Sequence, residues 1–297
     1  MPTGVFRPVE VLTPVGTGPA AVSRLSDVDG VAAAVAPGWT TGAGDLVQVW
    51  TAADPSSDEG RVVVQRVRDV AAHDRLGVVG GSPAEDADFI HAVYGDIGWV
   101  VLGVVVVTFL LLARALRSLW LPVKALLLNA ISLAAAYGVT VFIWQDGHGA
   151  SLLFGTPASG AITTWVPVAA FSFLFGLSMD YEVFILARMR ESYDAHGDTR
   201  RAVVDGIANT GRLVTSAALI LFLAFIALST VPAIEVKILA TTLALGIAID
   251  ALVVRGLLTP ALVAVLGRAN WRMPRGLARL LRTGPGEPSE RDQVRSR

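Results

Sequence analysis

The sequence predicts a polytopic α-helical membrane protein with five transmembrane helices and an N-terminal extracytoplasmic α/β subdomain. Hydrophobic residues make up 53% of its 297 residues and charged residues only 16%, whereas about a quarter of the residues in soluble domains are charged. The mean hydropathy is +0.59. The first 96 residues hold 13 of the 25 acids but only 6 of the 24 bases. The two ends of the chain are therefore expected to face different environments.

Residues 1–81 are predicted to form the α/β subdomain. A capping-box pattern at Ser56-Ser57-Asp58-Glu59 precedes valines at helical spacing, which indicates a helix. The other expected elements are strands at Val9–Leu12, Val31–Val35, Leu46–Trp50 and Leu76–Val79 and a helix at Gly18–Leu25. This β-α-β-β-α-β order is that of a ferredoxin-like split βαβ unit.

Residues 82–267 are predicted to form the transmembrane domain, because a membrane-spanning helix needs about 20 apolar residues. A second capping box, Ser82-Pro83-Ala84-Glu85, is expected to start a helix that leads into the first span. Trp99, Trp120, Trp144 and Trp165 lie near predicted span ends, as in an interfacial aromatic belt. The five predicted spans cover about residues 97–116, 121–144, 165–187, 213–231 and 236–258.

The basic residues predict the orientation of these spans in the cell membrane. They gather in alternate connections, and the positive-inside rule places such connections in the cytoplasm. The N-terminal subdomain and the 145–164 loop are then outside. Lys237 is the main exception to the rule, because it is a basic residue near the outer end of a span. The basic residues are Arg114, Arg117 and Lys124, then Arg188, Arg190, Arg200, Arg201 and Arg212, then Arg268, Arg272, Arg275, Arg279 and Arg282.

The C-terminal residues are predicted to be cytoplasmic. Residues 268–282 are basic and apolar in alternation, which favours an interfacial helix on anionic lipid headgroups. A solvated cytoplasmic helix is the alternative. Residues 283–297 are rich in Gly, Pro and charge and are expected to be disordered.

Metal and cofactor chemistry is not expected. The chain has no cysteine, none of its 4 histidines lies in a predicted span, and no glycine-rich phosphate loop is visible. ATP is therefore not the expected energy source for any membrane process.

Three acids lie inside predicted spans: Asp180, Glu182 and Asp250. Ionisable groups in a bilayer are costly and by default mark function. Asp180 is interpreted as a proton carrier, and the Tyr181 hydroxyl as a donor to a carboxylate on a neighbouring helix. A purely structural polar contact between helices is the alternative for both residues.

The other polar residues in the spans leave alternatives open. Glu182 is expected to form an interfacial ion pair with Arg188 or Arg190. Asp250 and Arg255 either form an internal ion pair or tune the proton site. Ser216 and its neighbour in the fourth span either bond Asp180 or bond back to their own helix.

The segment from Phe175 to Glu191, FGLSMDYEVFILARMRE, resembles the motif of MMPL transporters, the lipid-exporting branch of the RND superfamily. Three further stretches support the resemblance, which extends to about residue 282. They are RSLWLPVKA at 117–125, GRLVTSAA at 211–218 and NWRMP at 270–274.

The resemblance implies twelve spans in two pseudosymmetric halves, of which this chain looks like the eighth to twelfth spans. The N-terminal subdomain would be part of the second porter domain. Asp180 and Tyr181 would form the proton relay, with the Asp of one half meeting the Tyr of the other. The resemblance also makes Asp250 and Arg255 candidates for a supporting polar pair, and Ser216 is expected to be a further supporting polar residue.

The expected function is therefore proton-driven export of lipids or other hydrophobic molecules, and not enzyme catalysis. The expected partners are membrane lipids, the hydrophobic substrate, and either a missing N-terminal half or a second copy, but no nucleic acid. A fragment is expected because the N-terminal subdomain must cross the membrane without a visible signal sequence.

Two other classes of function remain as alternatives. One is a transport-inactive fragment or a docking and sensing module, which coupling to a proton gradient would distinguish from an exporter. The other is an intramembrane aspartyl protease, in which Asp180 and Asp250 share a proton to activate water. Neither aspartate lies in the Gly-x-Gly-Asp setting expected of such a protease.

Overall fold

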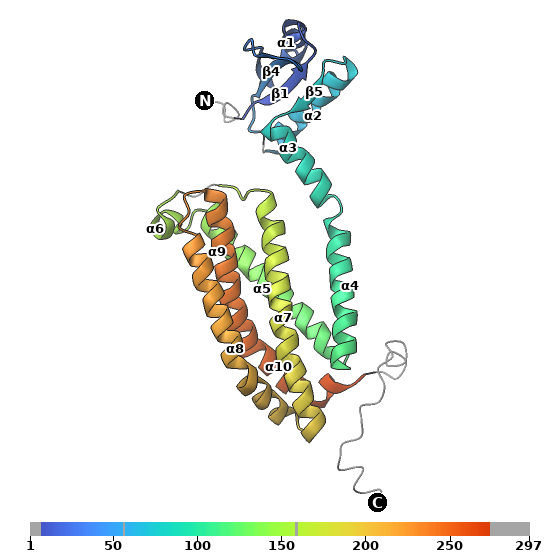
Figure 1. Cartoon of the computed structure of the whole chain (residues 1–297), viewed down its shortest axis with the longest axis vertical. Coiled ribbons are helices and arrows are strands. Elements are labelled where there is room, and N and C mark those ends of the chain that lie inside the picture. The colour runs from blue at the N-terminus through green and yellow to red at the C-terminus, as the bar shows by residue number, and fades with distance from the viewer. Residues whose placement is uncertain (1–6, 56, 158–159, 274–297) are drawn as a thin grey trace, which may run out of the picture. The chain divides into compact units, whose positions relative to one another are not determined.

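The computed structural model describes residues 7–55, 57–157 and 160–273 and divides into two compact units, Met1–Val100 and Val101–Arg297. Its elements confirm the predicted fold class (Figure 1). The first unit contains a small antiparallel sheet with helices. Among the described residues, five helices are long and apolar enough to cross a membrane.

The N-terminal sheet has the strand order β2-β4-β1-β5, and all its pairings are antiparallel. A short β3 also pairs with β4. This is the ferredoxin-like order that the sequence predicts, with strand ends shifted slightly. The elements are β1 (Val9–Thr13), α1 (Gly18–Ser26), β2 (Val31–Val35), β3 (Thr40–Thr41), β4 (Gly44–Thr51), α2 (Asp58–His73) and β5 (Val78–Gly80).

The core of this subdomain lies between the sheet and its two helices. Successive strand residues point to opposite faces of a sheet, so alternate valines of the central strands share one face. Val9 and Val11 on β1 and Val47 and Val49 on β4 are fully buried. They pack in one cluster with Leu25 of α1 and with valines of α2.

Helix α2 begins with a side-chain cap, one residue later than the predicted capping box implies. Ser57 is the N-cap, and its Oγ accepts a hydrogen bond from Gly60 N at 3.1 Å.

We expect Ser57→Ala to lower the stability of this subdomain by about 1 kcal/mol, because the first helical N–H groups lose an acceptor. Ser57→Asp, whose carboxylate can still accept this hydrogen bond, should retain most of the stability. Hydrogen exchange of the α2 amides measures both variants, and equal protection in Ser57→Ala would contradict the cap.

The helix predicted from Ser82 does begin there, but its N-cap is Gly81 and no side chain caps it. The second capping box is therefore wrong. Gly81 has φ +82°, and a Cβ there would lie 3.1 Å from Glu10 N and Pro8 O. Only glycine suits this backbone. The helix α3 (Ser82–Phe89) continues through a π-turn, η2 (Ile90–Tyr94), before α4 (Ile97–Leu116).

The helical bundle is built from the predicted spans and one short extra helix. Its segments pack mainly as neighbours along the chain, and α9 also packs on α5 and α7. The elements after α4 are α5 (Trp120–Thr140), η3 (Val141–Gln145), α6 (Ala150–Phe154), α7 (Trp165–His196), α8 (Thr199–Leu228), α9 (Ile234–Ile249), η4 (Asp250–Leu258), α10 (Thr259–Leu266) and η5 (Gly267–Trp271).

Helices α7 and α8 are longer than their predicted spans. They meet at a tight turn, where Gly197 has φ +69° and Asp198 caps α8 by accepting from Arg200 N at 2.9 Å. At Gly206, a Cβ would lie 2.4 Å from Met189 Cγ, so the two helices are in close contact. Hydropathy identifies only the apolar part of a helix that can lie in the membrane. It therefore does not predict the charged ends by which α7 and α8 extend beyond their spans.

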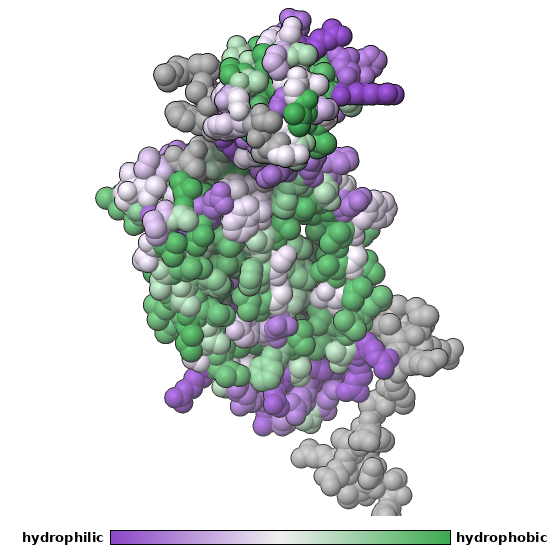
Figure 2. All heavy atoms as spheres, turned by 45° about the horizontal axis from the view of Figure 1, so that its top comes forward, coloured by the Kyte–Doolittle hydropathy of each residue, from purple (hydrophilic) through white to green (hydrophobic). Residues whose placement is uncertain are grey.

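The bundle surface is largely hydrophobic, with hydrophilic residues gathered at the end where α7 and α8 meet (Figure 2). Trp99 and Trp120 are exposed, as an aromatic belt requires. Trp144 is instead fully buried, and its Nε1 donates to Thr241 Oγ1 at 2.9 Å. The prediction that it belongs to the belt is wrong, because this hydrogen bond and the ring of Phe154 hold it inside.

The predicted interfacial helix at 268–282 is wrong at its start. Residues 267–271 form a single 3₁₀ turn, and Trp271 is buried and stacked on Tyr193 at 4.3 Å. Its Nε1 also donates to Thr199 Oγ1 at 3.0 Å. The indole is thus used inside the protein and not at the lipid surface. Residues 274–297, with the predicted tail, lie outside the described residues.

Candidate functional site in the membrane domain

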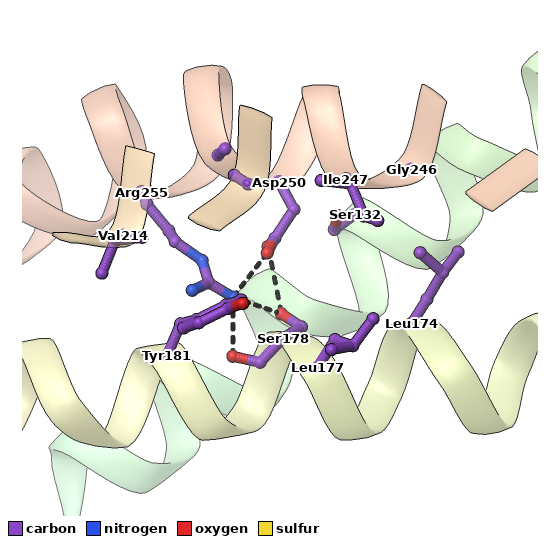
Figure 3. A pocket seen from close by; sticks show the side chains of 12 residues that line it. Ser132, Leu174, Leu177, Ser178, Tyr181, Val214, Gly246, Ile247, Asp250 and Arg255 are labelled. Atoms are coloured by element: carbon purple, nitrogen blue, oxygen red, sulfur yellow. Dashed lines mark hydrogen bonds and ion pairs between the residues drawn. The ribbon is translucent and has the colours of Figure 1, made fainter. Parts of the chain in front are cut away.

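A buried polar cluster lies between α7 and the last span. It consists of Ser178, Asp250, Arg255 and the ring of Tyr181, and we call it the Asp250 cluster (Figure 3). Arg255 Nη2 lies 2.5 Å from Asp250 Oδ2, and Ser178 Oγ donates to Asp250 Oδ1 at 3.0 Å. Arg255 Nη2 also donates to the Ser178 carbonyl at 2.6 Å. The structure contains the internal ion pair that was one of the two possibilities for Asp250 and Arg255, and a role of this pair in tuning the proton site stays a prediction.

The pairing of Asp250 with Arg255 depends on the helix type. In an α-helix, with 3.6 residues per turn, side chains five positions apart diverge by about 140°. The last span is π-helical from Asp250 to Leu258, and its hydrogen bonds close i to i+5. This wider winding brings the two side chains to the same side. Short π-helical segments occur frequently at functional sites.

Tyr181 contributes its ring to the cluster. The Arg255 guanidinium carbon lies 5.0 Å from the centroid of this ring, within the range of a cation–π contact. The predicted hydrogen bond from the hydroxyl of Tyr181 to a carboxylate on a neighbouring helix is not among the contacts of the described residues. Tyr181 therefore stabilises the arginine of the pair through its π face.

Asp180 lies outside the cluster. It is exposed on α7, whereas Ser178, Met179 and Glu182 are buried. This follows from helical geometry, since residues one and two positions apart point in different directions. The structure does not bring Asp180 and Asp250 together, which the protease alternative requires. Asp180 and Tyr181 therefore do not share a site within the described residues.

A second buried group surrounds Glu182, and we call it the Glu182 cluster. Glu182 is only 4% exposed, and its carboxylate accepts from Thr259 Oγ1 at 3.3 Å. Lys124 is buried nearby, interacts electrostatically with Glu182 and donates to Asn270 Oδ1. The Asn270 amide in turn donates to the Val263 carbonyl at 2.7 Å.

The prediction that Glu182 pairs with Arg188 or Arg190 at the interface is wrong. Arg188 pairs with Glu191 at 2.8 Å, and Arg190 pairs with Asp194 at 3.0 Å. Glu182 instead shares the inner face of α7 with buried apolar residues. Each arginine therefore pairs with an acidic residue about one turn away on its own helix, and Glu182 is buried without either of them.

Ser216 is exposed on α8 and donates to the carbonyls of Arg212 at 2.8 Å and Leu213 at 3.0 Å. Thr215 bonds back to its own helix in the same way. The structure therefore places Ser216 apart from Asp250 and Arg255. Val214 and Ala218, on the neighbouring face, are the α8 residues that line the Asp250 cluster.

Several residues of the two clusters were not predicted from the sequence to be site residues. Ser178, Lys124 and Thr259 each interrupt or flank an apolar stretch, and that polarity is the signal that could have identified them. Chemically, the clusters combine two carboxylates with two cations, so adding or removing one proton changes a buried charge balance. Among the described residues, no group of His, Cys, Asp and Glu is arranged to hold a metal ion.

Comparison with known proteins agrees with this architecture. The MMPL family model matches residues 20–282. The Streptomyces coelicolor protein SCO6666 is 41% identical over 217 residues, which are 73% of this chain and 30% of that protein. The Mycobacterium tuberculosis trehalose monomycolate exporter MmpL3 is 37% identical over 218 residues, which are 72% of this chain and 23% of that protein.

A third relative is the Mycolicibacterium smegmatis mycolic acid-containing lipids exporter MmpL11. It is 35% identical over 240 residues, which are 80% of this chain and 25% of that protein. The chain thus spans less than a third of the length of each of these relatives. The family match nevertheless covers most of the chain, including both buried clusters and Asp180. The chain belongs to the MMPL family.

Proposed function

We propose that this chain is the C-terminal half of a proton-driven membrane exporter, with Asp180 and Tyr181 in the proton relay. One observation carries the proposal: ionisable residues, among them Asp180, Glu182 and Asp250, lie within the spans of an MMPL-family chain. Such groups are costly in a bilayer and are kept where function requires them. The arginine of the Asp250 ion pair lies over the Tyr181 ring, and Asp180 is exposed on the same helix.

The substrate class proposed is lipids or other hydrophobic molecules. MmpL3 is named as an exporter of trehalose monomycolate, and the M. smegmatis MmpL11 as an exporter of mycolic acid-containing lipids. The M. tuberculosis MmpL11 is named as a heme uptake protein. All three names describe large molecules with apolar groups. The protein would act in the cell membrane as a secondary transporter and not as an enzyme, with its N-terminal domain outside and its C-terminus in the cytoplasm.

The proposal includes a partner for Asp180. A carboxylate exposed on a span would face hydrocarbon, which costs several kcal/mol. We infer that another helical bundle covers this face, either the N-terminal half of the transporter or a second copy of this chain. The tyrosine of that bundle would then face Asp180, as the resemblance implies.

The experiment is efflux of a lipophilic dye from proteoliposomes, driven by an imposed proton gradient. We expect gradient-dependent efflux to fall to the background rate in Asp180→Asn, because the amide cannot take up a proton. Glu191→Gln is the matched control, since it neutralises an exposed acid on the same helix and should leave efflux unchanged.

The assay is run with the chain alone and with an N-terminal half from a relative. Efflux that needs the added half supports the first kind of partner, and efflux by the chain alone supports self-association. Efflux that is insensitive to the gradient, or that is equal in Asp180→Asn and wild type, would overturn the proton relay.

A further inference from the structure

Asn129 is a buried amide that the proposed mechanism does not use. It lies on α5 and is only 2% exposed, and neither its Nδ2 nor its Oδ1 has a hydrogen-bond partner among the described residues. Buried polar side chains are almost always hydrogen-bonded, because desolvation without compensation is costly. An amide with both atoms unsatisfied therefore indicates a ligand that supplies an acceptor and a donor.

The packing of α5 on the last span places Asn129 between the two buried clusters. The Thr140 and Thr242 hydroxyls are 2.8 Å apart, and one turn further a Cβ at Gly246 would lie 3.2 Å from Ala136 Cβ. The helices are thus antiparallel, and the next turn of α5 brings Ser132 level with Asp250. Both residues line the same cavity. Asn129 follows one turn below, and Lys124 of the Glu182 cluster lies beyond it.

Arg255 provides a second set of unpartnered atoms, on the wall of the cavity that Ser132 also lines. Its Nη2 makes the bonds to Asp250 and Ser178, but Nε and Nη1 are buried without a partner in the described part of the chain. The guanidinium has five N–H donors in a fixed plane. The adjoining cavity, lined by Ser132, Tyr181 and Arg255 among others, has a volume of about 10 Å³. That is roughly the space for one water molecule.

We propose that Asn129, Ser132 and Arg255 hold internal water that extends the Asp250 cluster towards the Glu182 cluster. A buried water typically makes about three hydrogen bonds. Here the amide can donate and accept, the guanidinium can donate, and the serine hydroxyl can do either. Asp250 and Arg255 already balance each other in charge, so a neutral ligand suits the site better than an ion of either sign.

The position of this water gives it a function that rests on the proposed proton transport. Hydrogen-bonded water between the two clusters would carry a proton from the level of Asp250 to that of Lys124 and Glu182, nearer the arginine-rich end of the bundle. Asn129 is then a positioning residue, which acts by fixing water and not by taking up the proton.

The test uses the full chain in lipid nanodiscs. Infrared difference spectra between H₂¹⁶O and H₂¹⁸O report internal water through its O–H stretch. We expect wild type to show such a band and Asn129→Leu, which matches asparagine in size but cannot bind water, to lose it. Thr140→Val is the matched control: it removes a buried hydroxyl on the same helix whose partners are protein atoms. It should keep the band.

A second variant and a second measurement keep the proposal open to refutation. Ser132→Ala changes the volume little and should weaken the same band if leucine at 129 is not tolerated. An unchanged band in both variants would overturn the water site. A higher melting temperature of Asn129→Leu without loss of the infrared band would also overturn the water site, because it would mean that the Asn129 amide is buried without bound water.

Proton uptake by proteoliposomes separates the water site from the transport mechanism. Slower uptake in Asn129→Leu, with uptake abolished in Asp180→Asn, supports a proton route through the site. Loss of the infrared band with normal uptake would overturn the route and leave the water site established. Uptake that is unaffected by Asp180→Asn would refute the proposed relay, while the spectra would still decide the water site.

Discussion

Replacing Arg255 by leucine is expected to lower the free energy of unfolding by roughly 3–5 kcal/mol, because Asp250 would remain buried without its ion pair. Asp250 is 8% exposed and Arg255 5%. The Ser178 hydroxyl alone would then stabilise the carboxylate, and the Tyr181 ring would lose its cation. Denaturant unfolding of the full chain in bicelles measures the change.

The double variant Asp250→Asn with Arg255→Leu tests the physical reason. Replacing both members of a buried ion pair is often neutral, so most of the lost stability should return. Arg188→Leu is the control, since its pair with Glu191 is exposed, and such surface pairs contribute at most about 1 kcal/mol. If the double variant is as unstable as Arg255→Leu, lost packing and not the unpaired charge is the cause.

Gly60→Ala is expected to destabilise the N-terminal subdomain by about 1–3 kcal/mol, the usual cost of overpacking. A Cβ at this position would lie 1.9 Å from the carbonyl oxygen of Asp54 and 2.7 Å from Pro55 Cα. These are backbone atoms, so the whole loop before α2 would have to move. Hydrogen exchange of α2 and β1 amides in the full chain reports the loss of protection.

The sign of this effect is informative. Alanine is favoured over glycine in a helix by about 1 kcal/mol, so without the contact Gly60→Ala would stabilise α2. Gly80→Ala is the control in the same subdomain, because a Cβ there meets nothing within 4 Å. Increased protection in Gly60→Ala would show that the loop before α2 adjusts freely.

The positions of the spans could be predicted because hydropathy depends only on local sequence. The first span, 97–116, coincides with α4. The ends of α7 and α8 were missed because charged residues continue both helices up to the Gly197 turn. In the N-terminal subdomain the strand order followed from the succession of elements, whereas the α3 cap depended on the contact of Gly81 with β1, which local sequence does not report.

The candidate site was predicted less completely. Asp250 and Arg255 were identified as a possible pair, yet their contact relies on π-helical winding, which a period of 3.6 residues does not anticipate. Glu182 was assigned to the interface because arginines follow it. Its burial depends on which face of α7 packs inward, and that is decided by helices distant in the sequence. The exposure of Asp180 has the same origin.

The π-helical segment also restricts how this region can change in length. Each residue added to or removed from a helix turns everything after it by about 100°. A single deletion between Arg255 and Leu258 would therefore turn Thr259 away from Glu182. A deletion between Asp250 and Arg255 would have the same effect on Thr259, although it would leave the ion pair at a spacing of four residues, which α-helical winding alone brings together. Substitutions that preserve size can be absorbed one side chain at a time, but a change in residue count cannot. Among related sequences, this stretch should tolerate exchanges while remaining free of gaps.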